Sequence, residues 1–245
     1  MDIKQEMESL YARQEDVWKV NKGDKVKRNE LKLSLLKSFR RFEKGLDLCC
    51  GEGTITHRLP CGELTGIDVS EIAIERARKK YPHIKWVAQN INDVDIKSIS
   101  PGLVSWLDSN IYFNLQEKHK LLKQISEHFS VLLYSARLVG KRFKDYRKGC
   151  ELDSVFAVDD LIHQYFPHIR SQVAELDFFT YRGHTPLVHM KKCIFSAIVL
   201  ILTKFSKDKY TSRCNIVNKA IHVPVIRTFA APLVQQYAVV GFYKE

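Results

Sequence analysis

A short stretch in the first quarter of the chain combines an acid, two glycines and a helix start. Segment 45–54 reads Gly-Leu-Asp-Leu-Cys-Cys-Gly-Glu-Gly-Thr, so an apolar run that contains Asp47 leads into Gly51 and Gly53. The apolar run is typical of a buried strand in a parallel sheet. Glycines after such a strand allow a sharp turn and leave room for a ligand. The pattern predicts a phosphate or nucleoside site at the end of this strand.

A second carboxylate follows at a spacing that suits a ribose. Segment 63–70 alternates in polarity and places Asp68 at the end of a second expected strand. Asp68 lies within about 20 residues of the glycine turn, the separation expected for an acid that binds ribose hydroxyls. Ser70 is a suitable N-cap for a helix over 72–80. A third strand is expected over 84–88, so residues 45–90 predict a βαβαβ unit.

The turn itself distinguishes between nucleoside cofactors. The dinucleotide fingerprint needs a small residue three places after Gly53 to seat a pyrophosphate, and this chain has the β-branched Thr56 there. Glu52 also places a negative charge in the turn. Both residues disfavour an anionic pyrophosphate and favour a zwitterionic ligand that contains a ribose and an adenine.

These residues together resemble motif I of the class I S-adenosylmethionine-dependent methyltransferases, acid-x-Gly-x-Gly-x-Gly. Asp47 matches the acid, Gly51 and Gly53 match the last two glycines, and Cys49 stands where the first glycine is usual. The resemblance covers roughly residues 28–180 and the final strand. Its nearest type is the small-molecule N- or O-methyltransferase group, which includes nodulation-type N-methyltransferases.

The resemblance implies S-adenosyl-L-methionine as the cofactor and a set of site residues. Asn90 stands where the family usually has an acid that reads the adenine amino group. Asp108, after an expected fourth strand, matches an acid that faces the methyl group, although a helix-cap role is an equally weighted alternative. The cofactor-binding residues are expected to be Asp47, Cys49, Gly51, Gly53, Asp68, Val69, Asn90, Ile91 and Leu107. The acceptor pocket is expected to include Tyr11, Trp18, Asn110 and Tyr112.

The expected fold is α/β, with a Rossmann-like, seven-stranded, mostly parallel sheet, helices on both faces and an insertion before the last strand. Apolar spacing predicts helices over 28–42, 116–128 and 159–166, and strands over 131–135, 173–180 and 238–244, the last of them antiparallel. Residues 1–27 are expected to form an N-terminal lid segment over the cofactor. Their alternative is a helix whose aromatic residues pack on the sheet edge. Residues 28–245 would form the methyltransferase domain.

About 50 residues, 181–230, connect the expected strand over 173–180 to the last strand, where the resembling family usually has a short hairpin loop. A connection of this length suggests a function of its own. The centre of this segment, Ile194–Leu202, is strongly apolar but too short to span a bilayer, which needs about 20 residues. Lysines precede and follow it. The favoured interpretation is a cap-like subregion whose helix covers the acceptor pocket. The alternative is peripheral membrane contact through residues 191–209, as an interfacial anchor for anionic lipid.

Composition limits the partners and the compartment. The net charge of +11 permits nucleic acid or anionic membrane as partners, but a solvated basic surface is favoured because no aromatic RNA-binding motif is evident. The six cysteines include no Cys-x-x-Cys pair, so no metal site is expected. The first residues are polar and acidic, which predicts no signal peptide and a cytoplasmic protein with reduced thiols, with peripheral membrane association as the alternative.

The expected function is methyl transfer from S-adenosylmethionine to a nitrogen or oxygen atom of a small molecule. One alternative is an RNA or protein methyltransferase, which the basic charge suggests. The Asp/Asn-Pro-Pro-Tyr signature is absent after the expected fourth strand, which counts against that class. The other alternative is a non-catalytic homologue that only binds the cofactor. The retained acids and glycines count against it.

Overall fold

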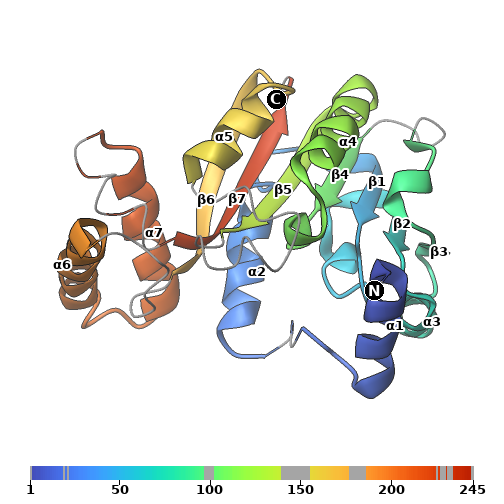
Figure 1. Cartoon of the computed structure of the whole chain (residues 1–245), viewed down its shortest axis with the longest axis horizontal. Coiled ribbons are helices and arrows are strands. Elements are labelled where there is room, and N and C mark those ends of the chain that lie inside the picture. The colour runs from blue at the N-terminus through green and yellow to red at the C-terminus, as the bar shows by residue number, and fades with distance from the viewer. Residues whose placement is uncertain are drawn as a thin grey trace.

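The computed structural model describes residues 2–18, 20, 22–96, 102–138, 155–176, 186–224, 226, 230 and 234–243. Seven strands form one sheet in the order β3-β2-β1-β4-β5-β7-β6 (Figure 1). Strand β7 runs antiparallel to both of its neighbours, and the other pairings are parallel. The expected mostly parallel, seven-stranded sheet with an antiparallel last strand is therefore confirmed. The strands are β1 (Phe42–Leu48), β2 (Cys61–Asp68), β3 (Lys85–Ala88), β4 (Leu103–Trp106), β5 (Val131–Arg137), β6 (His168–Leu176) and β7 (Val234–Phe242).

The sheet order places a ligand crevice beside β1. Chain order runs from β1 outward to β2 and β3 on one side, whereas β4 and β5 lie on the other side. The connections therefore leave β1 and β4 in opposite directions. In open α/β sheets, the crevice at the carboxyl ends of such strands is where ligands bind. Asp47, one residue before the end of β1, pairs with Ser105 of β4 and Gly66 of β2, so the expected site residues meet at this point.

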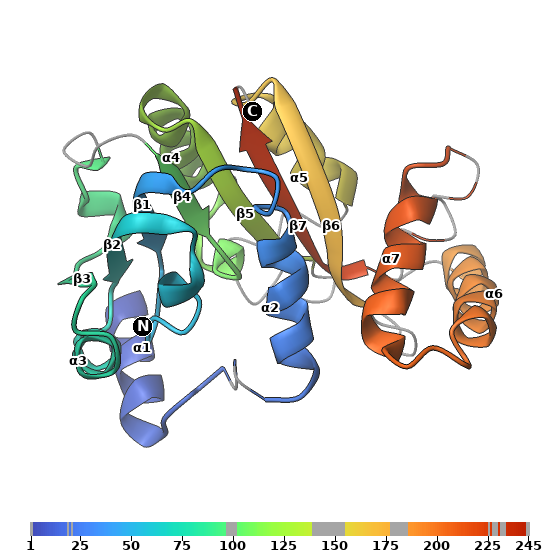
Figure 2. The ribbon, with the colours of Figure 1, turned by 180° about the vertical axis from the view of Figure 1, so that it is seen from behind.

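Helices cover both faces of the sheet, as Figures 1 and 2 show from opposite sides. Helices α4 and α5 lie on one face, over a core that includes Trp106, Leu122 and Ile162. Helix α2 and the turns after it lie on the other face, where Leu36 packs with Leu133. The helices are α1 (Ile3–Arg13), α2 (Asp24–Ser34), α3 (Glu71–Lys80), α4 (Leu115–His128), α5 (Val155–His163), α6 (Pro186–Leu202) and α7 (Lys209–Ile221).

Two local signals in the sequence act as expected at helix starts. Ser70 caps α3 by accepting a hydrogen bond from the Ala73 N–H, 3.2 Å away. Asn114 and Glu117 form a reciprocal capping box at the start of α4. Both caps fix a helix directly after a loop that borders the crevice, so they determine where those loops leave the sheet.

Several expected boundaries were wrong by a few residues. The helix expected over 28–42 begins at Asp24 and ends at Ser34, because successive tight turns follow and strand β1 already begins at Phe42. Strand β6 covers His168–Leu176 instead of 173–180, and residues 177–180 lie outside the described part of the chain. Strand β7 starts four residues before the expected strand over 238–244. Helix α5 covers Val155–His163 instead of the helix expected over 159–166.

The segment expected as an insertion contains α6 and α7. Helix α7 packs on β6 and α2, and α6 packs on α7, so α6 forms the outermost layer at the β6 edge (Figures 1 and 2). In the described part of the chain, no helix is long and apolar enough to cross a membrane.

The close packing of Gly66 against the Trp86 ring can be tested by substitution. A Cβ atom on Gly66 would lie 2.3 Å from the Trp86 ring, so the Gly66→Ala protein should lose about 1–3 kcal/mol of unfolding free energy in urea. In the double variant with Trp86→Leu, the smaller side chain leaves room for the methyl group. The combined loss should then be smaller than the sum of the single losses, and a simple sum would contradict the contact.

Candidate functional site

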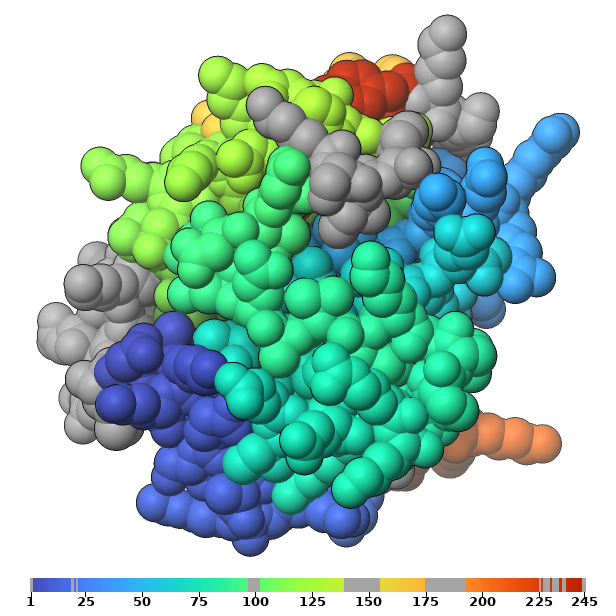
Figure 3. All heavy atoms as spheres, turned by 90° about the vertical axis from the view of Figure 1, so that its right-hand side faces the viewer, coloured from blue at the N-terminus to red at the C-terminus, as the bar shows by residue number. Residues whose placement is uncertain are grey.

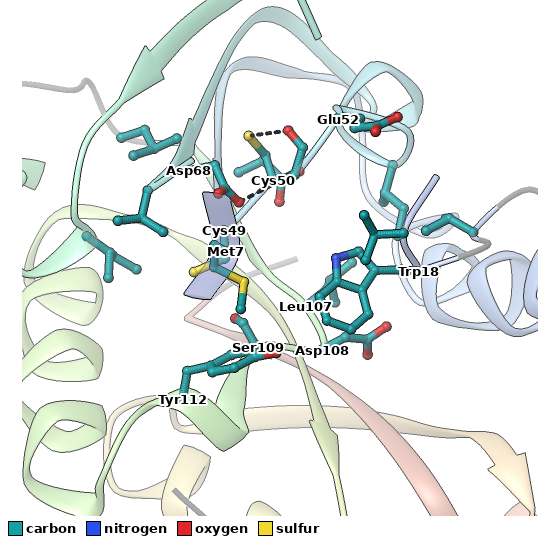
Figure 4. Close-up of a pocket in the computed structure, with 18 of the residues that line it drawn as sticks. Met7, Trp18, Cys49, Cys50, Glu52, Asp68, Leu107, Asp108, Ser109 and Tyr112 are labelled. Atoms are coloured by element: carbon teal, nitrogen blue, oxygen red, sulfur yellow. Dashed lines mark hydrogen bonds between the residues drawn. The ribbon is translucent and has the colours of Figure 1, made fainter. Parts of the chain in front are cut away.

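A cavity of about 290 Å³ opens at the carboxyl ends of β1, β2 and β4 (Figure 4). Its wall combines the turn after β1, the residues after β2 and β4, and the N-terminal segment. Most of the residues expected at the site line this one cavity, although they come from sequence positions far apart. These residues are Tyr11, Trp18, Asp47, Cys49, Gly51, Asp68, Val69, Asn90, Ile91, Leu107, Asp108 and Tyr112.

Two expected site residues do not line the cavity. Gly53 faces the other way, and a Cβ on it would lie 2.3 Å from the Trp86 ring. Asn110 is 1% exposed and clamps the ends of two strands. Its side chain accepts a hydrogen bond from the Arg137 N–H at 2.8 Å and donates one to the Arg137 carbonyl oxygen at 3.3 Å. Asn110 therefore holds the loop after β4 against the end of β5.

The turn after β1 keeps a glycine-type backbone although its first member is a cysteine. Cys49, Gly51 and Gly53 have φ angles of 58°, 55° and 74°. This left-handed region costs an ordinary side chain about 1–2 kcal/mol, whereas glycine adopts it freely. The substitution of Cys49 for glycine therefore leaves the expected turn intact. Burial raises the pKa of the Cys49 and Cys50 thiols, which keeps both as packing groups at neutral pH.

Asp68 holds this turn through its carboxylate. One oxygen accepts the Gly51 N–H at 2.8 Å (Figure 4), and the other accepts the Ser70 N–H at 3.0 Å. Burial raises the pKa of Asp68, and these hydrogen bonds oppose that effect. Because each carboxylate oxygen can accept about two hydrogen bonds, one position on each remains for hydroxyl donors in the cavity.

Asp47 forms a buried pair that the sequence pattern does not reveal. The Thr56 hydroxyl donates a hydrogen bond of 2.6 Å to Asp47, and Thr56 has no exposed surface. Burial raises the pKa of Asp47 to about 6, although the bond from Thr56 opposes the shift. The β-branched Thr56, which disfavours a pyrophosphate by its bulk, therefore also fixes the acid of the motif.

Asp108 belongs to a charged cluster that joins α2 to the cavity. Its carboxylate accepts hydrogen bonds from the fully buried Lys32 Nζ at 2.5 Å and from the Ser135 hydroxyl at 2.7 Å. The Arg28 guanidinium lies 3.7 Å away. Burial tends to raise the pKa of Asp108, but the charges of Lys32 and Arg28 outweigh it and hold the pKa below its usual value. Asp108 is therefore an ionised carboxylate, which is a weak base at neutral pH.

Sequence reasoning missed Arg28 and Lys32. They lie four residues apart on α2 and so share one face of the helix, a signal that was available. The apolar pattern of Leu31 and Leu35 suggested only core packing. A buried lysine is exceptional without a partner, and here Asp108 is that partner.

The N-terminal segment closes one side of the cavity. Met7 and Tyr11 of α1 are buried, and α1 packs against α3; Figure 3 shows the N-terminal residues in dark blue beside the teal surface of this region. The Tyr11 hydroxyl accepts a hydrogen bond from the Trp18 indole N–H at 3.1 Å. A Cβ on Gly51 would lie 2.7 Å from that hydroxyl oxygen, so Gly51 is needed for this close approach. The aromatic Tyr11 of this segment therefore packs against α3 and the turn after β1, and the lid role of residues 1–27 stays a prediction.

Glu52 ties the turn to this segment and to α3. Its nearly buried carboxylate receives the Lys80 ammonium at 2.5 Å, the Arg76 guanidinium at 3.0 Å and the Asp16 N–H at 3.2 Å. Arg76 also donates to the Tyr11 carbonyl oxygen at 2.8 Å. Burial tends to raise the pKa of Glu52, but the bonds from Lys80 and Arg76 outweigh it and lower the pKa, so the carboxylate stays charged.

The insertion takes no part in the described wall of this cavity. Every described residue that lines it lies at or before Arg137, whereas α6 and α7 lie at the β6 edge of the sheet. The covering helix expected from residues 181–230 is therefore not found among the described residues.

The raised pKa of Asp47 predicts a pH-dependent stability. Between pH of about 4, the ordinary carboxyl pKa, and the folded value, the folded chain keeps a proton that the unfolded chain has lost. The contribution of Asp47 to the free energy of unfolding therefore falls as the pH rises towards about 6. Asp47→Asn should remove a decline of about 2–3 kcal/mol over this window, measured by urea unfolding. Because burial also raises the pKa of Asp159, the variant is compared with the parent at each pH, and identical profiles would rule out the effect.

The contacts of Glu52 predict a second result. Glu52→Gln removes the charge that Lys80 and Arg76 share, so residues 2–18 should exchange amide hydrogens faster, by about tenfold or more. Hydrogen exchange read by mass spectrometry measures this change. Glu15→Gln is the matched control, because Glu15 is exposed in the same segment. Equal protection in both variants would show that Glu52 does not anchor the segment.

Comparison with known proteins connects this site to a family. Residues 46–130 match a family profile described as a methyltransferase domain. The chain is 36% identical over 96 residues to the 2-phytyl-1,4-naphtoquinone methyltransferase of Nostoc sp. (strain PCC 7120). That match covers 32% of this chain and 41% of the relative, so the chain spans less than half the length of the curated relatives it matches.

Solved structures agree with the fold. The N-methyltransferase NodS from Bradyrhizobium japonicum WM9, in complex with S-adenosyl-l-homocysteine, has a TM-score of 0.59 at 20% identity, covering 70% of this chain and 90% of that chain. Magnesium protoporphyrin IX methyltransferase from Synechocystis PCC 6803 has a TM-score of 0.53 at 15% identity, covering 74% and 95%. Residues 46–130 therefore match a methyltransferase domain, and the described chain shares the fold of these two methyltransferase structures.

Proposed function

We propose that this protein transfers a methyl group from S-adenosyl-L-methionine to a nitrogen or oxygen atom of a small molecule. The observation that carries the proposal is the left-handed turn at Cys49 and Gly51, which Asp68 holds in the wall of the cavity. This turn lies inside the residues that match the methyltransferase profile. The methyltransferases among the relatives and among the solved structures support the same reaction class.

The residues present fit such a cofactor. Asp68 has acceptor positions for two ribose hydroxyls, and Val69, Ile91 and Leu107 give the cavity apolar walls suited to an adenine ring. Asn90 also lines the cavity, and its side-chain oxygen already accepts the Asn92 N–H at 3.0 Å, so one acceptor position remains. When bound, the cofactor supplies a methyl group on a positively charged sulfur that is already activated for transfer.

The acceptor would lie on the side of Asp108, where Tyr112 also lines the cavity. The pairing of Asp108 with Lys32 favours a positioning role over proton abstraction. The negative charge of the carboxylate is already paired with the Lys32 ammonium, and its pKa is lowered. Alignment of the reacting atoms is then the main contribution of these residues. Trp18, about 40% exposed, would border the entrance.

The remaining parts of the proposal concern organisation and location. Residues 1–27 act as a lid, and residues 28–245 form the methyltransferase domain with 181–230 as an inserted subregion. A cytoplasmic location is supported by Cys49, Cys50 and Cys61, which lie in the described part of the chain as thiols and not in disulfides.

Calorimetric titration of the full chain with S-adenosylmethionine and S-adenosylhomocysteine tests the proposal. Asp68→Ala should weaken binding about ten- to a hundredfold, because charge-assisted hydrogen bonds to the ribose are lost. Asp68→Asn serves as a second variant that keeps an oxygen for the Gly51 N–H. Glu71→Ala is the control, because Glu71 is exposed and pairs with Lys4.

The outcomes are distinct. Unchanged affinity in both Asp68 variants would overturn the ribose assignment. A parent protein that binds neither compound would overturn the proposed function.

A further inference from the structure

An exposed apolar stripe runs along α6 and the turn after it. Ile194, Ile198, Ile201, Leu202 and Phe205 are 48%, 44%, 70%, 65% and 92% exposed. Their spacing of three and four residues places them on one side of the helix. Large side chains exposed together in this way mark an interaction surface, whereas isolated ones need no explanation.

A second side of the same helix, next to the stripe, is an ordinary packing face. Phe195 and Val199 are 8% and 0% exposed, and Thr203 is 1% exposed. This face packs against α7, which in turn packs on β6. The helix is therefore anchored through one face, and the stripe on the other face is not required for holding it in place.

Positive charge borders the stripe. Residues 186–207 contain no Asp or Glu, and Lys204 and Lys207 lie exposed at the end where the stripe finishes. The Lys204 Nζ lies 5.6 Å from the centre of the Phe205 ring, so the charge and the most exposed apolar side chain are neighbours. The nearest following acid, Asp208, pairs with Lys27 at 2.9 Å and so does not neutralise these lysines.

We infer that this surface binds the headgroup region of an anionic lipid bilayer. A helix with an apolar face bordered by lysines lies in the plane of a membrane, with its apolar side chains among the acyl chains and its cations near anionic headgroups. Charge complementarity favours this partner over a second copy of the chain. In a two-fold contact through the stripe, residues 186–207 of the second copy would offer no acid to pair with Lys204 and Lys207.

The position of α6 makes this surface independent of the candidate site. The helix lies at the β6 edge, whereas the cavity lies at the ends of β1, β2 and β4 (Figures 1 and 2). The inference does not rest on the proposed methyl transfer, and either can fail without the other.

Co-sedimentation of the full chain with unilamellar vesicles tests the inference. The chain should bind vesicles of phosphatidylcholine mixed with phosphatidylglycerol, bind phosphatidylcholine alone weakly, and lose binding as salt increases. The double variant Ile201→Ser with Phe205→Ser should reduce the partition coefficient roughly tenfold or more, since two large apolar groups no longer insert.

A second double variant leaves the apolar stripe intact. Lys204→Gln with Lys207→Gln should reduce binding to the anionic vesicles about fivefold for each lysine and leave the weak binding to phosphatidylcholine unchanged. The matched control is Leu115→Ser, because Leu115 is a 37% exposed apolar side chain on α4, and this variant should bind like the parent. Thermal unfolding followed by circular dichroism, together with calorimetry with S-adenosylmethionine, should be the same in all four proteins.

Three results would overturn the inference. The first is absence of binding to either kind of vesicle, and the second is equal binding to both kinds. The third is a dimer of the parent in solution that the Ile201→Ser, Phe205→Ser variant dissociates, since this would assign the stripe to a second copy of the chain.

Discussion

The hydrogen bond from the Gly51 N–H to the Asp68 carboxylate is the contact on which the candidate site depends. It joins the turn after β1 to the end of β2, so two loops that meet only at the edge of the sheet are held in one arrangement. The turn alone would be costly, because Cys49 adopts a left-handed backbone that disfavours side chains by about 1–2 kcal/mol. A buried hydrogen bond to a charged acceptor offsets a cost of this size.

The same turn controls how the N-terminal segment closes the cavity. Gly51 leaves room for Tyr11, and Glu52 receives charged donors from α3 as well as the Asp16 N–H. Helix α1 is also fixed to the first turn of α3, because the Glu8 carboxylate accepts the Glu71 N–H at 2.7 Å at the positive end of the helix dipole. The N-terminal segment is therefore connected to the start of α3 through Glu8 and to its later residues Arg76 and Lys80 through Glu52. Movement of this segment away from α3 would break charge-assisted contacts at both places.

The sequence was sufficient for the sheet and for the acids because both depend on local patterns. Asp47 and Asp68 lie near the carboxyl ends of two apolar strands. The carboxyl ends of neighbouring parallel strands lie at the same edge of the sheet. Boundaries were harder, since the end of α2 at Ser34 depends on tight turns that no proline or glycine in that region signals. The partners of the acids were not predictable for a similar reason. Whether Lys32 reaches Asp108 depends on how α2 crosses the sheet, and a pattern of single residues does not specify that angle.

The described helices of residues 181–230, α6 and α7, lie away from the described wall of the cavity. A strongly apolar helix in an insertion has more apolar surface than one packing face can bury. Packing over the acceptor pocket would bury the remaining apolar surface. In the structure, α6 buries Phe195 and Val199 on the side of α7 and leaves Ile194, Ile198, Ile201 and Leu202 exposed at the β6 edge. The free energy of leaving several large side chains in water is unfavourable by about 1.5–3 kcal/mol each if they could otherwise be buried. Contact with a partner that is both apolar and anionic would bury this stripe and pair the lysines beside it. A bilayer of anionic lipid has both properties.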